Sequence, residues 1–468
     1  MYQKWGDRMT SYKIPSFTEE KTGLIVKDIS CFQDGERVLL FESSGHILIA
    51  DSSILKMLVN KKIHPHVIRK LVSRGFIVSE AICSQTMCKK IVPEFFMVDM
   101  TTHCNMQCRY CLRDVNNCRI SISEEILMDI CSFIKRYCRE CGVRNITVQP
   151  WGGEPLLELD KILLMRKLLN IENTKVHFSI ETNALLLNER NLHTLYDNKI
   201  GIGISIDGFK EVHDSQRVLI NGQGTHHLVE ENLLRTQTLY GNRLGTITTV
   251  TKKNCDYIEE ILEYFAIKLH LTNVKFNFVH KSLFSDCSGL CLTKAEISDT
   301  VLRILNKLVE LNERGYIISE HNIKTKLKNL LFHEYSDICH SCGCHGGRSM
   351  IVFDMQGKIY PCELTDTPEE SIGSIYEPNC SLNDLVEHAS RTKDFYMSKK
   401  EDICNSCDWY VFCKGGCTVR TMSIGKRPPH IDEIECSVNL SLYPALIKLI
   451  LEKPQIVNRF LNEEVCGY

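Results

Sequence analysis

The sequence lacks features that would place it in several common classes of protein. It has no excess of either charge, because 56 lysines and arginines against 58 aspartates and glutamates leave a formal net charge of −2 over 468 residues. Such a chain has no global positive field with which to attract nucleic acid. It has no run of about 18 uncharged apolar residues, so no membrane-spanning helix is expected. Its opening, MYQKWGDRMTSYKIPS, has no apolar signal-peptide core. We expect a cytoplasmic protein without membrane or nucleic-acid partners.

What the chain has in abundance is cysteine, with 24 residues. Apolar residues at 43% and charged residues at 24% are ordinary for a protein with a real core. Secreted disulfide scaffolds are normally short chains, whereas this chain is long and has no secretory signal. Reduced cysteines in a cytosolic chain point to metal binding.

The first segment, from about residue 23 to residue 80, combines strand and helix signals. Its strand-like runs are followed by two helical stretches and a last apolar run. We expect a small α+β unit with helices on one face of a sheet. The runs are Val38–Phe41, His46–Ala50, Ser53–Val59, His64–Ser73 and Gly75–Val78.

The second segment, from Phe95 to about Gly315, repeats an apolar strand followed by a helix. Six such units predict a parallel sheet, either doubly wound or curved toward a barrel. In such sheets the chemistry lies at the carboxyl ends of the strands. The expected strands are Phe95–Met100, Asn145–Gln149, Lys175–Glu181, Gly201–Ser205, Leu244–Val250 and Val274–Val279.

The third segment begins near Tyr335 and has sparse strand and helix signals. Ten of the 24 cysteines lie between this point and Ser437. A segment with little apolar periodicity and many thiols is expected to fold around metal. The tail from Val438 to Tyr468 is apolar with a helical pattern, and the sequence assigns it no role.

Three cysteines directly follow the first expected strand, in the order Cys104-x3-Cys108-x2-Cys111. Three thiolates on one tight loop can hold three irons of an iron–sulfur cubane, which normally takes four cysteines. One iron then stays open to another ligand. The alternative is a structural zinc knuckle, but such sites are closed by four protein ligands.

The cysteine spacing, with Tyr110 before the last cysteine, resembles the CxxxCxxC signature of the radical S-adenosylmethionine (SAM) superfamily. In that family the open iron chelates the amino and carboxylate groups of SAM. Gly152-Gly153-Glu154 follows the second strand and is similar to the family's GGE motif, which binds the SAM amine. Glycines allow close backbone approach, and a carboxylate accepts hydrogen bonds from an ammonium. The alternative is a plain turn with a surface glutamate.

Two further strand ends resemble the family pattern. Asn183 ends the third strand and Ser205 the fourth, and Arg217 follows in a run similar to SxDGP…HDxxR, with Phe209 in place of proline. The resemblance implies that Tyr110, Asn183, Ser205 and Arg217 contact SAM, with Ser205 at the ribose and Arg217 at the carboxylate. The alternative is capping and turn chemistry.

Seven C-terminal cysteines and Gly357 match the pattern of the SPASM domain. This module holds two auxiliary [4Fe–4S] clusters in radical SAM enzymes that act on peptides and proteins. Zinc in the CxxC pairs is the competing metal, and Cys342 or a substrate thiol could replace Cys339 below. The resemblance assigns Cys339, Cys344, Cys362 and Cys417 to auxiliary cluster I, and Cys404, Cys407, Cys413 and Cys436 to auxiliary cluster II.

Glu363 directly follows Cys362. In sulfatase maturases of this superfamily an acidic residue at this place is the general base, so the resemblance makes Glu363 the candidate catalytic base. The alternative is a solvated side chain with no role.

The first segment resembles the recognition element of enzymes that mature ribosomally synthesised peptides (RiPPs), a winged-helix-like module. The matching stretches are Arg37–Phe41, Ile47–Ile49 and Leu71–Ile77. In that module the leader of a precursor peptide adds a strand to an exposed sheet edge. A winged helix also suggests DNA, but the candidate recognition helix has basic residues only in its later half.

Together these resemblances predict three units: a leader-recognition element at 1–92, a partial (β/α)6 TIM-type radical SAM barrel at 93–330, and a SPASM domain at 331–468. They imply a peptide maturase that forms cysteine thioether crosslinks by way of a 5′-deoxyadenosyl radical, as in sactipeptides and ranthipeptides. Three [4Fe–4S] clusters and SAM are the implied cofactors. A leader-bearing precursor peptide and a flavodoxin- or ferredoxin-type reductant are the implied partners.

Three other functions stay open at this point. Anaerobic sulfatase maturases, which form formylglycine, share barrel and SPASM domain, but they begin close to the first cluster motif, without ninety residues before it. Another peptide crosslink, carbon–carbon or carbon–oxygen, would use the same machinery. An iron–sulfur electron carrier would explain the thiols, but it would not need an open-iron site beside Glu154 and Ser205.

Overall fold

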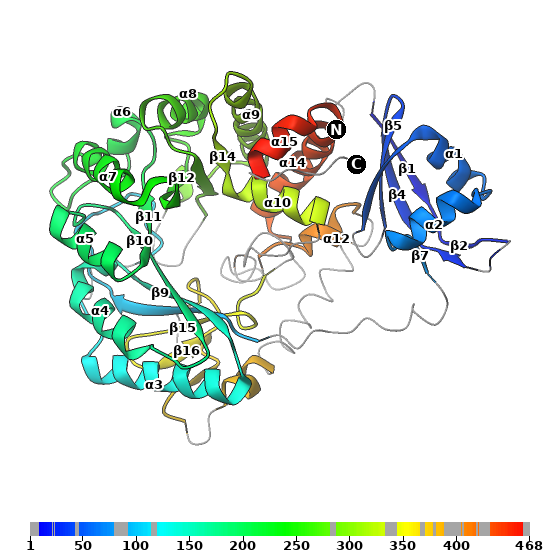
Figure 1. The fold of residues 1–468 in the computed structure, drawn as a ribbon. Helices are drawn as coiled ribbons and strands as arrows, with labels where there is room; N and C mark the ends of the chain where they lie inside the picture. Colours follow the sequence, from blue (N-terminus) through cyan, green and yellow to red (C-terminus); the bar gives the residue numbers. More distant parts are fainter. Residues whose placement is uncertain are drawn as a thin grey trace.

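The computed structural model describes residues 9–20, 22, 24–42, 46–78, 92–113, 119–280, 287–332, 344–365, 370–377, 381–387, 404, 407–417, 420 and 431–461. Its largest element is a ten-stranded sheet with the order β14-β13-β12-β11-β10-β9-β8-β15-β16-β17 (Figure 1). Six strands in this order follow one another along the chain and are parallel, so the predicted sheet of β/α units is confirmed.

The parallel strands and the helices between them form the partial barrel. A short strand, β14 (Ser319–Glu320), extends the sheet beyond the sixth strand. The strands are β8 (Phe95–Thr101), β9 (Asn145–Gly152), β10 (Lys175–Thr182), β11 (Ile200–Ser205), β12 (Gly245–Val250) and β13 (Asn273–Phe278). The helices are α3 (Glu124–Cys141), α4 (Leu159–Leu168), α5 (Glu189–Asp197), α6 (Lys210–Asp214), α7 (His226–Tyr240), α8 (Ile258–Glu263), α9 (Lys294–Glu313) and α10 (His321–Phe332).

Local sequence explains both the helices and the hollow of the barrel. Ser123 caps α3 by accepting a hydrogen bond from the Ile126 amide, and the helix ends at Gly142 in a left-handed conformation (φ 63°). In β11 three isoleucines are buried and alternate with half-buried small residues. Since successive side chains point to opposite faces, Gly203 and Ser205 share the face opposite the isoleucines. Such small side chains leave room inside the barrel.

The C-terminal segment extends the barrel sheet. Strand β15 (Met350–Phe353) pairs in parallel with β8, and β16 (Lys358–Tyr360) and β17 (Gly373–Ser374) add to it antiparallel. The strands have two to four residues, too few to give a clear periodic signal. Because Cys362 follows β16 directly, this extension carries it to the barrel edge.

The N-terminal unit contains two small sheets with the helices α1 (Ser52–Val59) and α2 (Pro65–Ser73). Buried leucines, among them Leu40, Leu55 and Leu71, join the helices to one face of the larger sheet. The larger sheet has the order β1-β4-β5-β6, with β1 (Met9–Ile14), β4 (Ile29–Asp34), β5 (Arg37–Glu42) and β6 (Ile47–Asp51), and the smaller β2-β3-β7, with β2 (Phe17–Thr18), β3 (Ile25–Val26) and β7 (Ile77–Val78). The strands before residue 37 were not anticipated.

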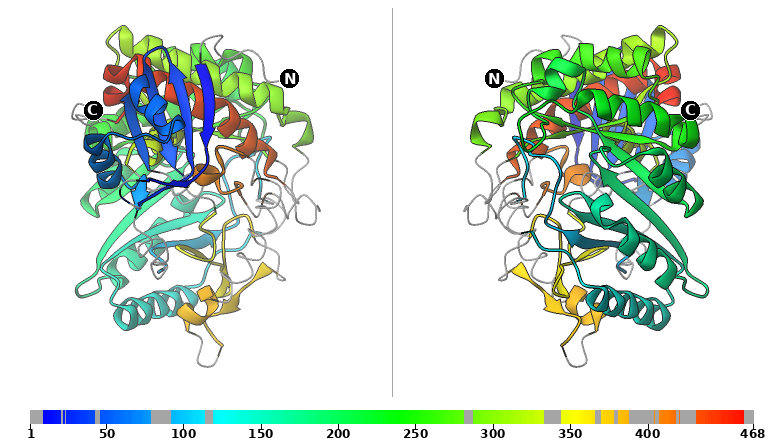
Figure 2. Two further views of the ribbon diagram at one scale, coloured as in Figure 1. Left: turned by 90° about the vertical axis from the view of Figure 1, so that its right-hand side faces the viewer. Right: turned by 90° about the vertical axis from the view of Figure 1, so that its left-hand side faces the viewer.

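The other face of that sheet packs on the C-terminal part of the chain. The Phe32 ring stacks on Trp409 with centroids 5.1 Å apart, and Trp409 stacks on Tyr443 at 5.5 Å. These rings come from β4, from the turn before α12 (Tyr410–Cys413), and from α14 (Glu433–Glu452), which α15 (Pro454–Leu461) follows. Figures 1 and 2 show the blue unit beside the red helices. The first and last segments are therefore joined through an aromatic core.

Helix α14 is long and mostly apolar. Among the described residues it alone is long and apolar enough to cross a membrane, and 67% of its apolar window is buried inside the protein. Its buried side chains include Leu442, Tyr443 and Leu446, which belong to the main core.

Candidate active site

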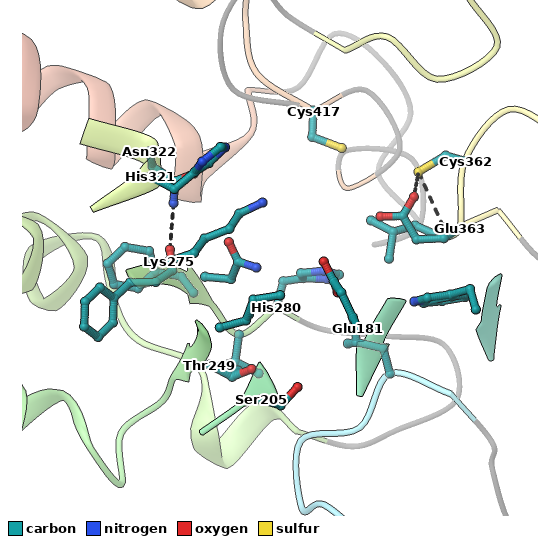
Figure 3. A pocket seen from close by; sticks show the side chains of 18 of the residues that line it. Glu181, Ser205, Thr249, Lys275, His280, His321, Asn322, Cys362, Glu363 and Cys417 are labelled. Atoms are coloured by element: carbon teal, nitrogen blue, oxygen red, sulfur yellow. Dashed lines mark hydrogen bonds between the residues drawn. The ribbon is translucent and has the colours of Figure 1, made fainter. Parts of the chain in front are cut away.

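A cavity of ≈ 1040 Å³ opens at the carboxyl ends of the barrel strands. Its wall includes all three cysteines of the 104–111 loop and the turn at Gly152 and Gly153. Across the cavity lie three thiols of the C-terminal segment, Cys344, Cys362 and Cys417. Figure 3 shows two of these thiols above Glu181 and Ser205. Two cysteine groups far apart in sequence therefore face one space.

The cysteine loop is shielded from water. Cys104 is buried beside Met106, with Cys108 and Cys111 packed against them. Burial, together with the charges of neighbouring thiols, raises the pKa of Cys104 to about 12; burial also raises the pKa of Cys108 to about 11, with Arg217 opposing the shift and Cys111 adding to it. Three crowded, desolvated thiols become thiolates only if cationic partners offset their charge, as iron does. The donor set thus fits an iron–sulfur cluster.

The arrangement differs from that of a single-ion site. In the described part of the chain, no three histidine, cysteine or acidic side chains converge on one metal ion. A cubane takes one thiolate on each iron, so its cysteines stay apart around the cluster. The geometry is compatible with a cluster and does not favour zinc at the first loop.

The glycine turn lies directly against the cysteine loop. Gly152 has φ +138°, and a Cβ there would lie 2.3 Å from the Thr101 carbonyl oxygen. A Cβ on Gly153 would lie 2.3 Å from the His103 carbonyl oxygen. The Gly153 amide donates to Thr101 O at 2.8 Å, and the Glu154 amide to His103 O at 2.9 Å. The turn therefore needs glycines to hold the cysteine loop this closely.

We expect Gly153→Ala to push the cysteine loop away from the turn, because the backbone atoms it would meet cannot swing aside. The expected loss is about 1–3 kcal/mol in the free energy of unfolding, with SAM cleavage falling about tenfold or more. Gly245→Ala is the matched control, since a Cβ there meets nothing within 4 Å. Denaturant unfolding and a 5′-deoxyadenosine assay measure the two effects. Equal stability and cleavage in both variants would contradict the close-approach argument.

Glu154 is buried at 1% exposure and holds the end of β10. Its Oε1 accepts hydrogen bonds from Thr182 Oγ1 (2.7 Å) and the Leu156 amide (3.1 Å), and its Oε2 from the Asn183 amide (2.9 Å). Burial raises its pKa, and these bonds oppose that shift. A carboxylate accepts about four hydrogen bonds, so one position is left for a ligand donor at the cavity.

Asn183 links β10 to the cysteine loop. Its Nδ2 donates to Asn105 Oδ1 at 2.7 Å and lies 3.8 Å from Cys104 Sγ, while its Oδ1 accepts from the Leu185 amide at 3.1 Å. The side chain is 6% exposed and lines the cavity. Asn183 is therefore held in place at the loop that carries the thiols.

Tyr110, Arg217 and Asp207 form a buried chain of hydrogen bonds behind Cys108. Arg217 Nη1 donates to the Tyr110 hydroxyl at 2.6 Å, and that hydroxyl donates to Asp207 Oδ2 at 2.6 Å. Asp207 also accepts from Gln216 Nε2 (2.9 Å). Arg217 is 7% exposed, and its Nε has no hydrogen-bond partner among the described residues. A buried, unpaired guanidinium donor at the cavity wall suits an anionic ligand group.

The barrel interior adds polar side chains that the sequence patterns did not single out. Figure 3 shows Glu181 and Lys275 in the cavity, together with Ser205 and Thr249 at neighbouring strand ends. Burial raises the pKa of Glu181, the positive charge of Lys275 lowers it, and Glu363 raises it. Lys275 and Asn277 alternate with the apolar residues of β13, and this alternation could have marked Lys275 as a cavity residue.

The C-terminal thiols form two groups. The Cys417 thiol hydrogen-bonds to that of Cys344, which, with burial, raises the pKa of Cys417. Cys362 and Cys417 share an apolar cluster, and Cys362 Sγ donates to Glu363 Oε2 at 3.0 Å. Cys339 and Cys342 lie outside the described residues.

The second group surrounds the start of α14. Burial, together with the charges of Cys407 and Cys404, raises the pKa of Cys436 to about 11. Burial raises the pKa of Cys413 to about 12, with Glu435 adding to the shift. Cys417 also lies close to the start of α14, because its amide donates to Asp432 Oδ2 at 2.9 Å.

Comparison with known proteins decides the nature of the barrel. Residues 98–265 match the family model described as the radical SAM superfamily. The barrel is a radical SAM domain. The matched residues include the cysteine loop, the glycine turn, Ser205 and Arg217. The chain therefore contains a radical SAM domain at residues 98–265.

Curated relatives of the chain include anaerobic sulfatase-maturating enzymes. A cysteine-type anaerobic sulfatase-maturating enzyme of Clostridium novyi is 27% identical over 337 residues, covering 68% of this chain and 85% of its own. A serine-type anaerobic sulfatase-maturating enzyme of Klebsiella aerogenes is 21% identical, covering 69% and 79%.

The similarity of fold to solved structures extends beyond the radical SAM domain. The structure of native anSMEcpe with bound AdoMet and Cp18Cys peptide matches with TM-score 0.65 and 20% identity, covering 79% of this chain and 99% of that one. Streptococcus suis SuiB bound to precursor peptide SuiA matches with TM-score 0.53 and 14% identity, covering 85% and 95%. The protein has the fold of SPASM-type radical SAM enzymes.

Proposed function

We propose that the protein is a radical SAM peptide maturase that forms cysteine thioether crosslinks in a ribosomally synthesised peptide. The observation that carries the proposal is the single cavity that meets both the Cys104–Cys111 loop and the thiols of Cys344, Cys362 and Cys417. A substrate in this space can reach a SAM-binding cluster on one side and an auxiliary cluster on the other.

The size of the cavity supports two occupants. Small-molecule sites usually have volumes of about 300–1,000 Å³, and this cavity has ≈ 1040 Å³. The proposed clusters and SAM would take part of this volume, and Glu181 and Lys275 line the cavity as well. A short stretch of peptide is proposed to bind beside these two side chains.

The chain's own residues would hold SAM as follows. Cys104, Cys108 and Cys111 would hold a [4Fe–4S] cluster beside the bound SAM. Glu154 offers its remaining acceptor position to the SAM ammonium, and Arg217 its free donor to the carboxylate. When bound, this cofactor pair supplies reductive cleavage of SAM to methionine and a 5′-deoxyadenosyl radical. Tyr110, behind Cys108, fixes the orientation of Arg217.

Further contacts complete the proposed site. Gly152 and Gly153 let the backbone approach SAM, Asn183 orders the cysteine loop, and Ser205 meets the ribose. Two auxiliary [4Fe–4S] clusters bring the total to three. Their proposed ligands are Cys339, Cys344, Cys362 and Cys417 for cluster I, and Cys404, Cys407, Cys413 and Cys436 for cluster II.

The N-terminal unit is proposed to bind the leader of the precursor peptide by adding a strand to β6. In the described sheet β6 pairs only with β5, so β6 is an edge strand. In this pair Ile47 lies opposite Phe41, and Ile49 lies opposite Leu39. The Glu42 amide donates to His46 O, so Glu42 and His46 form a hydrogen-bonded pair. Such pairs alternate along an antiparallel ladder with pairs that are not hydrogen-bonded to each other. The backbone groups of Ile47 and Ile49 therefore point away from β5. Outward groups of this kind are what a peptide strand binds.

Leader binding predicts a local change in amide exchange. With full-length protein and a synthetic leader, hydrogen exchange at Ile47 and Ile49 should slow about tenfold or more, since each amide gains a hydrogen bond. The core part of the same precursor, without leader, is the control and should leave β6 unchanged. Slowed exchange confined to the barrel strands would place the leader elsewhere and refute this role of the unit.

The product distinguishes the proposed reaction from its relatives. A peptide encoded by a short cysteine-rich reading frame near the gene would be the first substrate to try, with SAM and a flavodoxin- or ferredoxin-type reductant. A thioether removes two hydrogens and one alkylatable thiol per crosslink, and a reducing agent does not restore the thiol. Mass loss with every thiol still alkylatable would indicate a carbon–carbon or carbon–oxygen crosslink and reject thioether formation.

A second candidate is formylglycine formation, which the sulfatase-maturating relatives favour. Glu363 lines the cavity beside Cys362, where it could act as a general base. Conversion of a cysteine to formylglycine replaces sulfur by oxygen, so the product gains a carbonyl that a hydrazine reagent labels. Under this candidate Glu363→Gln abolishes product but keeps SAM cleavage. A hydrazine-reactive product would replace the thioether proposal.

A further inference from the structure

A group of charged side chains lies buried beside the C-terminal cysteines. Lys326 on α10 is 1% exposed, and its Nζ lies 2.7 Å from Oε1 of Glu435, which is 4% exposed. Arg420 binds Asp432 through Nε at 3.0 Å and Nη2 at 2.5 Å. Its Nη2 also lies 3.8 Å from Glu435 Oε2. Glu435 is therefore shared between two cations.

Stability alone explains this group poorly. Removing an ion from water costs several kcal/mol, and apolar side chains of similar volume often serve as well. The surroundings would suit them, because Lys326 lies over the Tyr443 ring at 5.5 Å and α14 is otherwise a core helix. Asn439 Nδ2 donates to Glu435 at 3.1 Å, so the carboxylate is well satisfied. Because burying these charges costs free energy that apolar side chains would not cost, the charges themselves are expected to have a function.

The group contacts cysteines assigned to different clusters. On one side, the Cys417 amide donates to Asp432 Oδ2 at 2.9 Å, and the Arg420 amide donates to Cys417 Sγ at 3.3 Å. On the other side, Cys413 hydrogen-bonds to the Asn439 side chain and lies within the electrostatic reach of Glu435 and Lys326. Each cation thus stands near one thiol.

We propose that Lys326, Glu435 and Arg420 form an electrostatic bridge between the two auxiliary clusters that sets their reduction potentials. This inference rests on the proposed function, because it requires clusters at Cys417 and Cys413. Reduction adds one negative charge to a cluster, so a nearby cation favours the reduced state and a nearby carboxylate disfavours it. Arg420 acts on cluster I, Lys326 on cluster II, and Glu435 moderates both. All three act through their charges and are not proposed as cluster ligands.

The two ends of the bridge predict opposite shifts. Lys326→Met removes a positive charge, so at a fixed potential the ratio of reduced to oxidised cluster II should fall about tenfold or more. Glu435→Gln keeps the shape but removes the negative charge, so both clusters should be easier to reduce. The double variant K326M/E435Q should lie between the single variants. Lys307→Met is the control, since Lys307 pairs with Glu263 at 2.9 Å on the outer helices α9 and α8.

The test is a redox titration of the reconstituted full-length proteins, followed by electron paramagnetic resonance, with iron content measured on each sample. Opposite midpoint shifts in the two single variants, with an unchanged control, support the bridge. Equal midpoints with full iron content overturn it. Loss of cluster iron from both single variants and from the double variant also overturns it, because the group would then only hold the loops together. Wild-type protein without auxiliary iron would instead refute the proposed function.

Discussion

Replacing Cys104, Cys108 and Cys111 together by alanine is expected to abolish 5′-deoxyadenosine formation and to remove about a third of the iron of the reconstituted protein. The three thiols face the cavity beside Glu154 and Asn183, and the loop has no other cysteine to replace them. The fold should persist, because these three thiols belong to a small separate cluster and not to the main core. Iron analysis and chromatography of the nucleoside product measure both effects. Formation of 5′-deoxyadenosine by this variant would show that the SAM cluster is assigned to the wrong cysteines.

Replacing Cys344, Cys362 and Cys417 together by alanine is expected to give the complementary result. SAM cleavage without peptide should continue, since these thiols belong to the C-terminal segment and are not among the residues proposed to hold the first cluster and SAM. Crosslinked peptide should disappear, and about a third of the iron should be lost. The two triple variants are matched controls for each other, because each removes three cavity thiols.

The outcome that would contradict this second prediction is a full yield of crosslinked peptide. Auxiliary cluster I would then have no part in the reaction. The cavity that both cysteine groups line would no longer support the proposed function. Loss of SAM cleavage as well would show that the C-terminal thiols support the first site structurally.

The barrel could be predicted from sequence because its signals are local and long. Each strand is a run of six to eight residues followed by a helix, and the motifs stand at strand ends, where a parallel sheet gathers its chemistry. The spacing of the cysteine loop and the glycine turn carried the radical SAM reading. The close packing of Gly153 on His103 is a tertiary fact that spacing alone does not contain.

The contacts between segments far apart in the chain could not be predicted from the sequence. Strand β15 joins β8 across about 250 residues of chain, and strands of two to four residues leave no periodic pattern. The stacking of Phe32 on Trp409 likewise joins the first segment to the last. For this reason removal of the N-terminal unit would expose an aromatic surface, and the leader hypothesis is better tested in the full chain.

The buried pair Lys326–Glu435 shows a different limit. A lysine in an amphipathic helix and a glutamate in the first turn of another read as solvated side chains. Only the packing of α10 on the start of α14 brings them together at 2.7 Å.

The central claim is that the cavity presents a peptide directly to the SAM site. Transfer of deuterium from peptide to 5′-deoxyadenosine tests it most directly. The cognate precursor, made with deuterium on its side-chain and α carbons, is incubated with enzyme, SAM and reductant, and the nucleoside is analysed by mass spectrometry. We expect 5′-deoxyadenosine to gain one deuterium in step with crosslinked product. Crosslinked product accompanied by 5′-deoxyadenosine free of deuterium would contradict the account.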